Sequence, residues 1–209
     1  MAADSKLVGS LMMGKRTSAQ TLALVQDAHD CLRSGHLPTI LTDAFASYES
    51  ALLTVFGRRY PAKGRGHRPV MRWRQGLAYG QVKKSYKGGR VEGVAVRAVH
   101  GKARLEQVLY LLGDKQLNTS VGERHNGTSR LRNQRKVRKT LAFSKARRYH
   151  GWMSWVSVGL YNFCRPHSSL KIKQADQVTQ RSPAMAGGVT DHLWSTREWL
   201  LRPVLGGQR

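Results

Sequence analysis

Short apolar runs and amphipathic stretches alternate over residues 6–57, and this alternation restricts the fold more than any other feature of the sequence. The runs 6–14 (KLVGSLMMG) and 37–43 (LPTILTD) predict strands, the second of them buried. Residues 17–35 and 44–57 carry apolar side chains at helical spacing, and each stretch ends at a glycine. The order strand–helix–strand–helix is typical of an α/β domain with parallel strand pairing.

The rest of the chain predicts further strands and helices. Residues 70–101 contain three candidate strands, and residues 103–113 predict a short amphipathic helix. A long helix is expected from about Ser120, a second apolar helix after it, and shorter helices that start at Ser182 and Ser195. The second apolar helix carries one stripe, for which core packing is favoured over a base-stacking surface: Trp152, Trp155, Val156, Gly159, Leu160 and Phe163.

Positive charge dominates the composition, with 36 Lys and Arg residues against 12 Asp and Glu residues and a formal net charge of +24. Most basic residues lie in 58–104 and 124–148, where Glu92 is the one acid. A solvated surface normally interleaves both signs, so these tracts indicate contact with a polyanion, of which nucleic acid is the usual one. Trp73 and Tyr79 could stack on bases there, or simply occupy half-buried strand positions. The sequence has no apolar run of the roughly 18 residues that a membrane helix requires, so no membrane role is expected.

The two cysteines, Cys31 and Cys164, are far apart and lack a CxxC spacing. Free thiols in a reducing cytosol are the simplest interpretation. Cys164 lies near His167, but zinc needs further ligands that this stretch does not supply.

Two acids occupy positions that suggest chemistry. Asp43 ends a predicted strand, and Glu123 stands at the head of the basic helix, with no further carboxylate until Asp176. Strand ends in open α/β sheets are where ligands gather, and carboxylates are the oxygen ligands that Mg²⁺ prefers. The simpler interpretation of Glu123 is that an acid in the first turn complements the helix dipole.

Four segments of the chain, in order, resemble the catalytic domain of bacterial insertion-sequence transposases of the DDE type: LTDAFASY, NTSVGERHNGTSRLRNQRKVRKTLAFSK, YNFCRPHSSL and SPAMAGGVTDHLWS. The similarity covers most of the chain from Ser5 to about Leu200, and the E-R-x-N pattern before a basic helix is its most specific motif. The resemblance implies an α/β, RNase H-like fold, which is a mixed β-sheet flanked by helices. It also implies an Asp-Asp-Glu triad that binds two Mg²⁺ (or Mn²⁺) ions and cuts and joins DNA by attack of water or a 3′-hydroxyl.

On this resemblance Asp43 is the second acid of the triad and Glu123 is the third, and both are catalytic residues and metal ligands. The first aspartate should lie on a strand upstream, where Asp4 is the one acid available and falls in a turn. We therefore expect a fold that is incomplete at its N-terminus. Residues 1–165 would form the RNase H-like catalytic domain without its first strand, and residues 166–209 a C-terminal helical tail that packs on it.

Helix geometry extends this expectation along the basic helix. Asn126, Arg130 and Gln134 follow Glu123 on one helical face, with Gly127 between them, and so are suited to contact a phosphate or sugar near the metal ions. The other expected phosphate contacts are basic residues: Arg124, Arg132, Arg135, Lys136, Arg138 and Lys139.

The function expected from the resemblance is metal-dependent DNA strand cleavage and strand transfer during transposition of an insertion sequence, impaired in this chain because the first aspartate has no match. The implied partners are the element ends and target DNA, in the bacterial cytoplasm at the nucleoid, and a homodimer or higher oligomer on DNA is left open. One alternative is a non-catalytic basic nucleic-acid-binding protein that reuses the fold and binds in a salt-dependent manner without metal. Another is an RNase H-like nuclease that acts on RNA–DNA hybrids.

Overall fold

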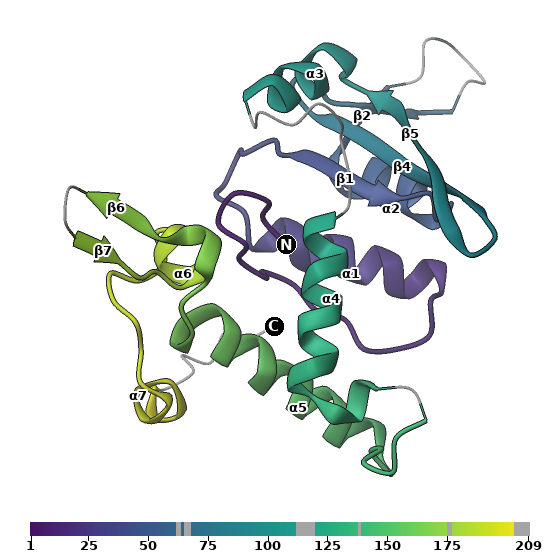
Figure 1. Ribbon diagram of the computed structural model, residues 1–209. Coiled ribbons are helices and arrows are strands. Elements are labelled where there is room, and N and C mark those ends of the chain that lie inside the picture. Colours follow the sequence, from purple (N-terminus) through teal and green to yellow (C-terminus); the bar gives the residue numbers. More distant parts are fainter. Residues whose placement is uncertain (62–63, 65–67, 112–119, 138, 175–176, 203–209) are drawn as a thin grey trace. The chain divides into compact units, whose positions relative to one another are not determined.

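The protein is a mixed α/β structure in which a mixed sheet is flanked by helices, as the computed structural model shows (Figure 1). The structure describes residues 1–61, 64, 68–111, 120–137, 139–174 and 177–202. The chain divides into two compact units: Met12–Ser120, called the central unit below, and Met1–Leu11 with Val121–Arg209, called the terminal unit. The expected domain of residues 1–165 with a tail of residues 166–209 stays a prediction.

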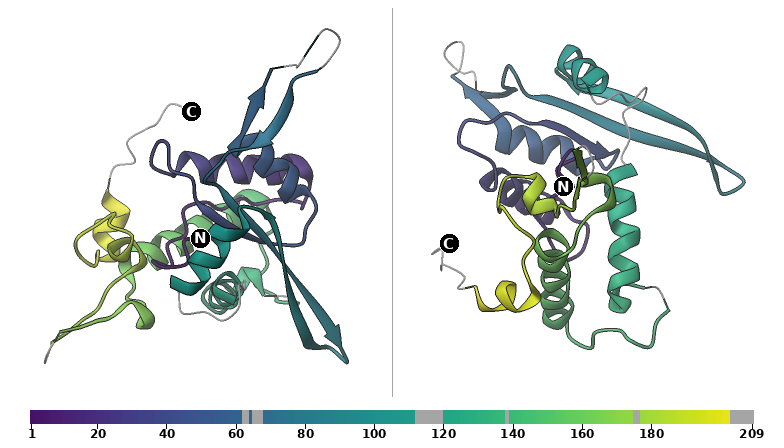
Figure 2. Two further views of the ribbon diagram at one scale, coloured as in Figure 1. Left: turned by 90° about the horizontal axis from the view of Figure 1, so that it is seen from above. Right: turned by 60° about the vertical axis from the view of Figure 1, so that its left-hand side comes forward.

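The sheet of the central unit has the strand order β1-β4-β5. The elements of this unit are α1 (Ser18–Asp30), β1 (Thr39–Asp43), α2 (Ser47–Phe56), β2 (Gly57–Tyr60), β3 (Val70–Trp73), β4 (Ala78–Lys87), β5 (Arg90–His100) and α3 (Lys102–Leu111). β1 runs parallel to β4, with Asp43 opposite Val82, and β4 runs antiparallel to β5. The β4–β5 hairpin extends beyond β1 (Figure 2), and β2 pairs separately with β3.

Alternate residues at the start of β4 face helices on opposite sides of the sheet. Leu77 and Tyr79 are buried in a cluster with side chains of α1 and α2, whereas Ala78 is buried against Leu105 of α3. This period-two burial explains why helices cover both faces of the sheet. The ring of Tyr79 is fully buried, so Tyr79 is a core residue and not a surface for stacking bases.

The terminal unit is mainly helical. Its elements are α4 (Ser120–Arg132, whose first residue belongs to the central unit), a 3₁₀ turn η1 (Gln134–Lys136), α5 (Arg147–Gly159), a π-helical turn η2 (Leu160–Cys164), a 3₁₀ turn η3 (Ser168–Leu170), β6 (Ile172–Gln174), β7 (Gln177–Thr179), α6 (Pro183–Ala186) and α7 (Thr196–Leu201). β6 and β7 form an antiparallel pair. Within the described ranges, no helix combines the length and apolar character needed to cross a membrane.

The strand predicted over residues 6–14 is wrong, because no strand forms there. The backbone N–H and carbonyl of Val8 bond to a side chain instead of to a neighbouring strand. The buried amide of Asn162 accepts a hydrogen bond from the Val8 N–H (3.1 Å) and donates one to the Val8 carbonyl (2.9 Å). β1 pairs in parallel with β4 and not with a strand over residues 6–14. Because β4 lies after residue 57, the pattern of the first 57 residues could not predict this pairing.

Most helix starts were predicted correctly. The hydroxyl of Thr17 accepts a hydrogen bond from the Gln20 N–H and caps α1, and Ser182 and Ser195 cap α6 and α7 in the same way. The ends were less accurate, since α1 ends at Asp30, before the expected glycine. These caps depend on contacts within four residues, which is why the sequence reveals them.

Candidate functional site

Asp43 lies at the C-terminal end of β1 and forms an ion pair with Arg16 of the same unit. The Arg16 Nη2 donates to the Asp43 Oδ2 at 2.5 Å, and the side chains are 58% and 53% exposed respectively. The Asp43 Oδ1 accepts the Phe45 N–H at 3.3 Å, and the Arg16 guanidinium lies 4.1 Å from the centre of the Phe45 ring. The carboxylate is therefore accessible to solvent and oriented by two hydrogen bonds, one to each oxygen.

Tyr48 is a neighbour whose titration the charge of Asp43 affects. Burial, and then the negative charge of Asp43, raises the pKa of the Tyr48 hydroxyl. Beneath the strand end, the hydroxyl of Thr42 lies 3.1 Å from that of buried Tyr79. Asp43 thus lies partly exposed at a strand end whose preceding residue, Thr42, contacts the buried Tyr79.

The chemistry of Asp43 suits a divalent cation in one respect and opposes it in another. A carboxylate at a strand end offers the oxygen ligands that Mg²⁺ binds. However, Arg16 already occupies Oδ2, so a cation would have to displace this guanidinium. In the part of the chain that the structure describes, no three His, Cys, Asp or Glu side chains come together in a group able to hold a metal.

Glu123 is exposed in the first turn of α4, in the terminal unit. Asp43 belongs to the central unit, so the pairing of the two acids stays a prediction. Arg124, Asn126 and Arg130 are exposed on the same helix, consistent with a surface that contacts another molecule. The position of Glu123 also satisfies the simpler interpretation, in which its charge complements the helix dipole.

The basic helix is shorter than expected and ends at Arg132. Asn133 then leaves the helical conformation, and its side chain accepts the Arg135 N–H at 3.1 Å to cap η1. Gln134 is therefore on η1 and does not share the α4 face with Glu123, contrary to the prediction. An asparagine is a common cap, which is the signal in the sequence that could have placed this break.

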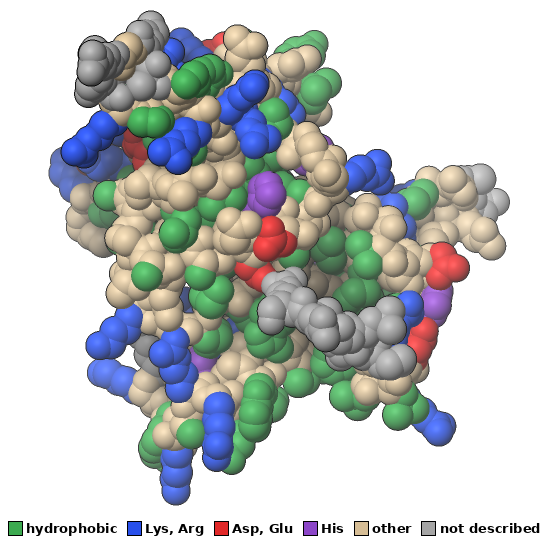
Figure 3. All heavy atoms as spheres, turned by 180° about the vertical axis from the view of Figure 1, so that it is seen from behind, with side chains coloured by type: hydrophobic (Ala, Val, Ile, Leu, Met, Phe, Trp, Pro, Cys, Tyr) green, Lys and Arg blue, Asp and Glu red, His purple; other side chains and the backbone are tan. Residues whose placement is uncertain are grey.

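The other predicted DNA contacts fall into three groups. Arg135 and Lys136 donate hydrogen bonds to serine hydroxyls of the same unit, to Ser144 (3.1 Å) and Ser129 (2.8 Å). Lys139 is exposed, with a positive φ of 56°. Arg138 lies outside the described residues. On the face drawn in Figure 3, Lys and Arg side chains are widely spread and acidic side chains are few.

A cluster that the sequence did not reveal surrounds Tyr161. The ring of His125 lies 4.7 Å from that of Tyr161, the ring of His167 lies 6.2 Å from it, and the Arg132 guanidinium lies 5.8 Å from its centre. Burial, and then the charges of Lys136, the N-terminal amine and Arg132, lowers the pKa of His125 to about 4. His125 is consequently neutral at physiological pH.

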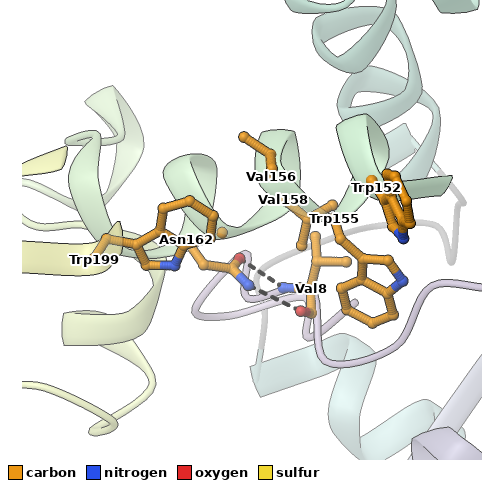
Figure 4. Close-up of a pocket in the computed structure, with 8 residues that line it drawn as sticks. Val8, Trp152, Trp155, Val156, Val158, Asn162 and Trp199 are labelled. Carbon is orange, nitrogen blue, oxygen red and sulfur yellow. Dashed lines mark hydrogen bonds between the residues drawn. The ribbon is translucent and has the colours of Figure 1, made fainter. Parts of the chain in front are cut away.

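An apolar pocket lies along α5, and it corrects the predicted burial of this helix (Figure 4). Trp152 and Trp155 are 59% and 47% exposed, whereas Ser154 and Val158 are buried. The hydroxyl of Ser154 donates to the His150 carbonyl at 2.7 Å, which allows a polar residue to occupy the buried face. The pocket is lined by Val8, Trp152, Trp155, Val156, Val158, Gly159, Asn162 and Trp199.

Comparisons of the chain with models of protein families, with curated proteins and with solved structures find no match.

Proposed function

We propose that this protein is the catalytic part of a DDE-type transposase with an RNase H-like fold, and that Asp43 and Glu123 hold a divalent metal ion against a DNA phosphate. The observation that carries the proposal is Asp43, an exposed carboxylate at the C-terminal end of a strand in a mixed sheet flanked by helices. Ligands of open α/β sheets gather at such strand ends. The strand that carries Asp43 is tied to the core at the preceding residue, where the Thr42 hydroxyl lies 3.1 Å from that of buried Tyr79.

The second support is the helix that Glu123 heads. Arg124, Asn126 and Arg130 are exposed on α4, so a duplex that reaches Glu123 would meet cationic and amide donors along the same helix. A net charge of +24 favours association with DNA before any specific contact forms.

In the proposed reaction, a water or 3′-hydroxyl oxygen forms a bond to phosphorus while the P–O3′ bond breaks, and the departing 3′-oxygen takes up a proton. Bound Mg²⁺ would lower the pKa of the attacking hydroxyl and neutralise charge on the leaving oxygen. The residues of this chain contribute orientation: Asp43 is fixed by Phe45, and the cations of α4 hold the backbone. The chain supplies two of the three triad acids.

The test is a strand-transfer assay with this chain joined to an N-terminal segment that carries the first aspartate. The joined protein is expected to transfer an element end to target DNA only with Mg²⁺ or Mn²⁺. Asp43→Asn and Glu123→Gln should each abolish transfer, whereas Glu106→Gln, a carboxylate paired with Lys102 on α3, should not. Full transfer activity in the Asp43 and Glu123 variants would refute the assignment.

A second candidate function is non-catalytic binding of nucleic acid, and the Arg16–Asp43 ion pair favours it, because the guanidinium occupies an oxygen that a metal would need. This function predicts salt-dependent DNA binding that neither metal nor Glu123→Gln changes. A filter-binding titration with and without Mg²⁺ separates the two functions.

A further inference from the structure

Tyr161 is the centre of a cationic cluster drawn from several segments of the terminal unit. Its ring is buried, 6% exposed, and contacts His125 and Arg132 of α4 and His167 from the loop after η2. Tyr161 itself lies in η2, a π-helical turn, and such turns are rare and frequently mark functional sites.

The N-terminal segment is attached to the same turn in a strained conformation. Lys6 has a φ of 59°, in the left-handed region that residues with a side chain rarely adopt. The Tyr161 hydroxyl donates to the Lys6 carbonyl at 3.3 Å, and Asn162 makes two hydrogen bonds to Val8. These contacts hold the backbone of the segment, while the Lys6 ammonium donates to the Ala3 carbonyl and its charge acts on His167.

The charges of the cluster act on one another. Burial, followed by Lys6, Arg132 and Arg124, lowers the pKa of His167. Burial, followed by Arg165, lowers the pKa of Arg132. The positive form of both side chains is therefore disfavoured by their surroundings, and an anion bound beside Arg132 and Arg165 would relieve the repulsion between the two guanidinium groups.

The hydrogen-bonding pattern leaves donors to meet such an anion. The His167 Nδ1 accepts the Ser169 N–H at 3.3 Å, so in neutral His167 the proton is on Nε2, which can donate. The buried Nδ1 of His125 makes no hydrogen bond among the described residues. Arg132 and Arg165 add guanidinium donors, which match the oxygens of a phosphate in geometry.

We propose that Lys6, Arg124, Arg132, Arg165 and His167 form a phosphate-binding site around Tyr161 that holds the nucleic-acid backbone. The inference rests on the proposed function for the nature of the ligand, and it adds Lys6, Arg165 and His167, which no basic tract or helix face of the sequence marks. A DNA phosphate is the favoured ligand because two members of the site, Arg124 and Arg132, lie on the same helix as Glu123.

The test is the affinity of the whole protein for a fluorescein-labelled DNA duplex, measured by anisotropy in EDTA between about 50 and 200 mM salt, the range over which phosphate contacts change affinity most. Lys6→Gln, Arg165→Gln and His167→Gln are the test variants. Lys173→Gln and Arg197→Gln, which remove exposed charges from the same unit, are the matched controls. Circular dichroism confirms that each variant is folded.

Lys6→Gln and Arg165→Gln are expected to weaken binding about tenfold, the effect of losing one charge-assisted hydrogen bond. Each should also lower the slope of log K against log salt by about 0.9, the value for one phosphate contact. His167→Gln should weaken binding less, since Gln keeps a donor. The controls should change affinity less than about twofold, because single exposed charges away from the contact add little.

Affinities and slopes equal to those of the controls would overturn the proposal. So would unchanged DNA binding together with loss of binding to poly-glutamate, which would assign the site to an acidic protein partner. EDTA removes metal from the measurement, so this result is independent of whether Asp43 and Glu123 support strand transfer.

Discussion

The carboxylate of Asp43 is bound by the guanidinium of Arg16, with 2.5 Å between Oδ2 and Nη2, at the strand end where a metal ligand is proposed. Both side chains are more than half exposed, so water screens the pair and its contribution to the stability of the fold is small. The ion pair therefore has a larger effect on the binding of other cations by Asp43 than on the stability of the fold.

Arg16→Gln removes the cation that competes for Asp43. We expect the affinity of the protein for Mn²⁺ to rise by about threefold or more, because even a screened charge at this distance is worth roughly 1 kcal/mol. The free energy of unfolding should change by less than about 1 kcal/mol. Calorimetric titration of Mn²⁺ measures the first and urea unfolding the second. Weaker Mn²⁺ binding in the variant would mean that Arg16 orients Asp43 and does not compete for it.

Gly159→Ala tests the packing of α7 on α5. A Cβ at Gly159 would overlap the indole ring of Trp199, so we expect a loss of about 1–3 kcal/mol of stability, typical of overpacking. Gly151→Ala on the same helix is the control. No heavy atom lies within 4 Å of a Cβ there, and the change should stabilise the helix by up to about 1 kcal/mol. Unfolding temperatures that shift in the same direction for both variants would contradict this packing.

Asn162→Ala removes both hydrogen bonds to Val8 and leaves two backbone groups without partners. We expect a loss of about 2–4 kcal/mol, on the basis of 1–3 kcal/mol for each buried polar group left unpaired. Ser157→Ala, at an α5 position whose hydroxyl donates to the Met153 carbonyl, should change stability by less than about 0.5 kcal/mol. Equal stabilities of the two variants in urea unfolding would show that Asn162 does not hold the N-terminal segment.

His125 should make the protein less stable in acid. Its pKa is lowered to about 4, so the unfolded chain takes up a proton below about pH 6.5 and the folded protein does not. The stability contributed by neutral His125 is complete above about pH 6.5 and is lost as the pH falls toward 4. Allowing for partial exposure, the loss is on the order of 1 kcal/mol.

Urea unfolding of the protein and of His125→Phe between pH 7 and 4 measures this loss, and the variant should lose less stability over that range. Histidine NMR gives a direct comparison with His192. That ring lies between Asp191 and Glu198, which raise its pKa, so His192 should titrate above the ordinary value and His125 well below it. Titration of both histidines at the ordinary value would contradict the structure.

Local features of the fold were readable from the sequence, and features that depend on distant partners were not. Thr17, Ser182 and Ser195 each cap a helix through the N–H three residues later, so composition and spacing sufficed. The strands β3, β4 and β5 were also predicted from their composition, whereas the antiparallel pairing of β4 with β5 comes from the structure. The segment around Val8 has a strand-like composition, but its partner is a side chain 154 residues away.

The residues of the candidate site also fall into those that the sequence predicted and those that it did not. Asp43 could be placed at a strand end because the apolar run before it is short and stops there. The Tyr161 cluster could not be foreseen, since it depends on a π-helical turn and on residues as far apart as Lys6 and His167. The exposed Trp152 likewise departs from the hydrophobic pattern, because Ser154 satisfies its hydroxyl within the helix and takes the buried position.

We propose that Asp43 and Glu123 share one metal ion, and the affinity for Mn²⁺ in the presence of a DNA duplex tests this proposal. Asp43→Asn, Glu123→Gln, the double variant and the Glu106→Gln control are compared by calorimetry. If the two acids share the ion, each single change weakens Mn²⁺ binding at least about tenfold and the double change weakens it little further, the non-additivity expected of groups in contact. Mn²⁺ affinities of both single variants equal to that of Glu106→Gln would show that Asp43 and Glu123 do not bind the ion.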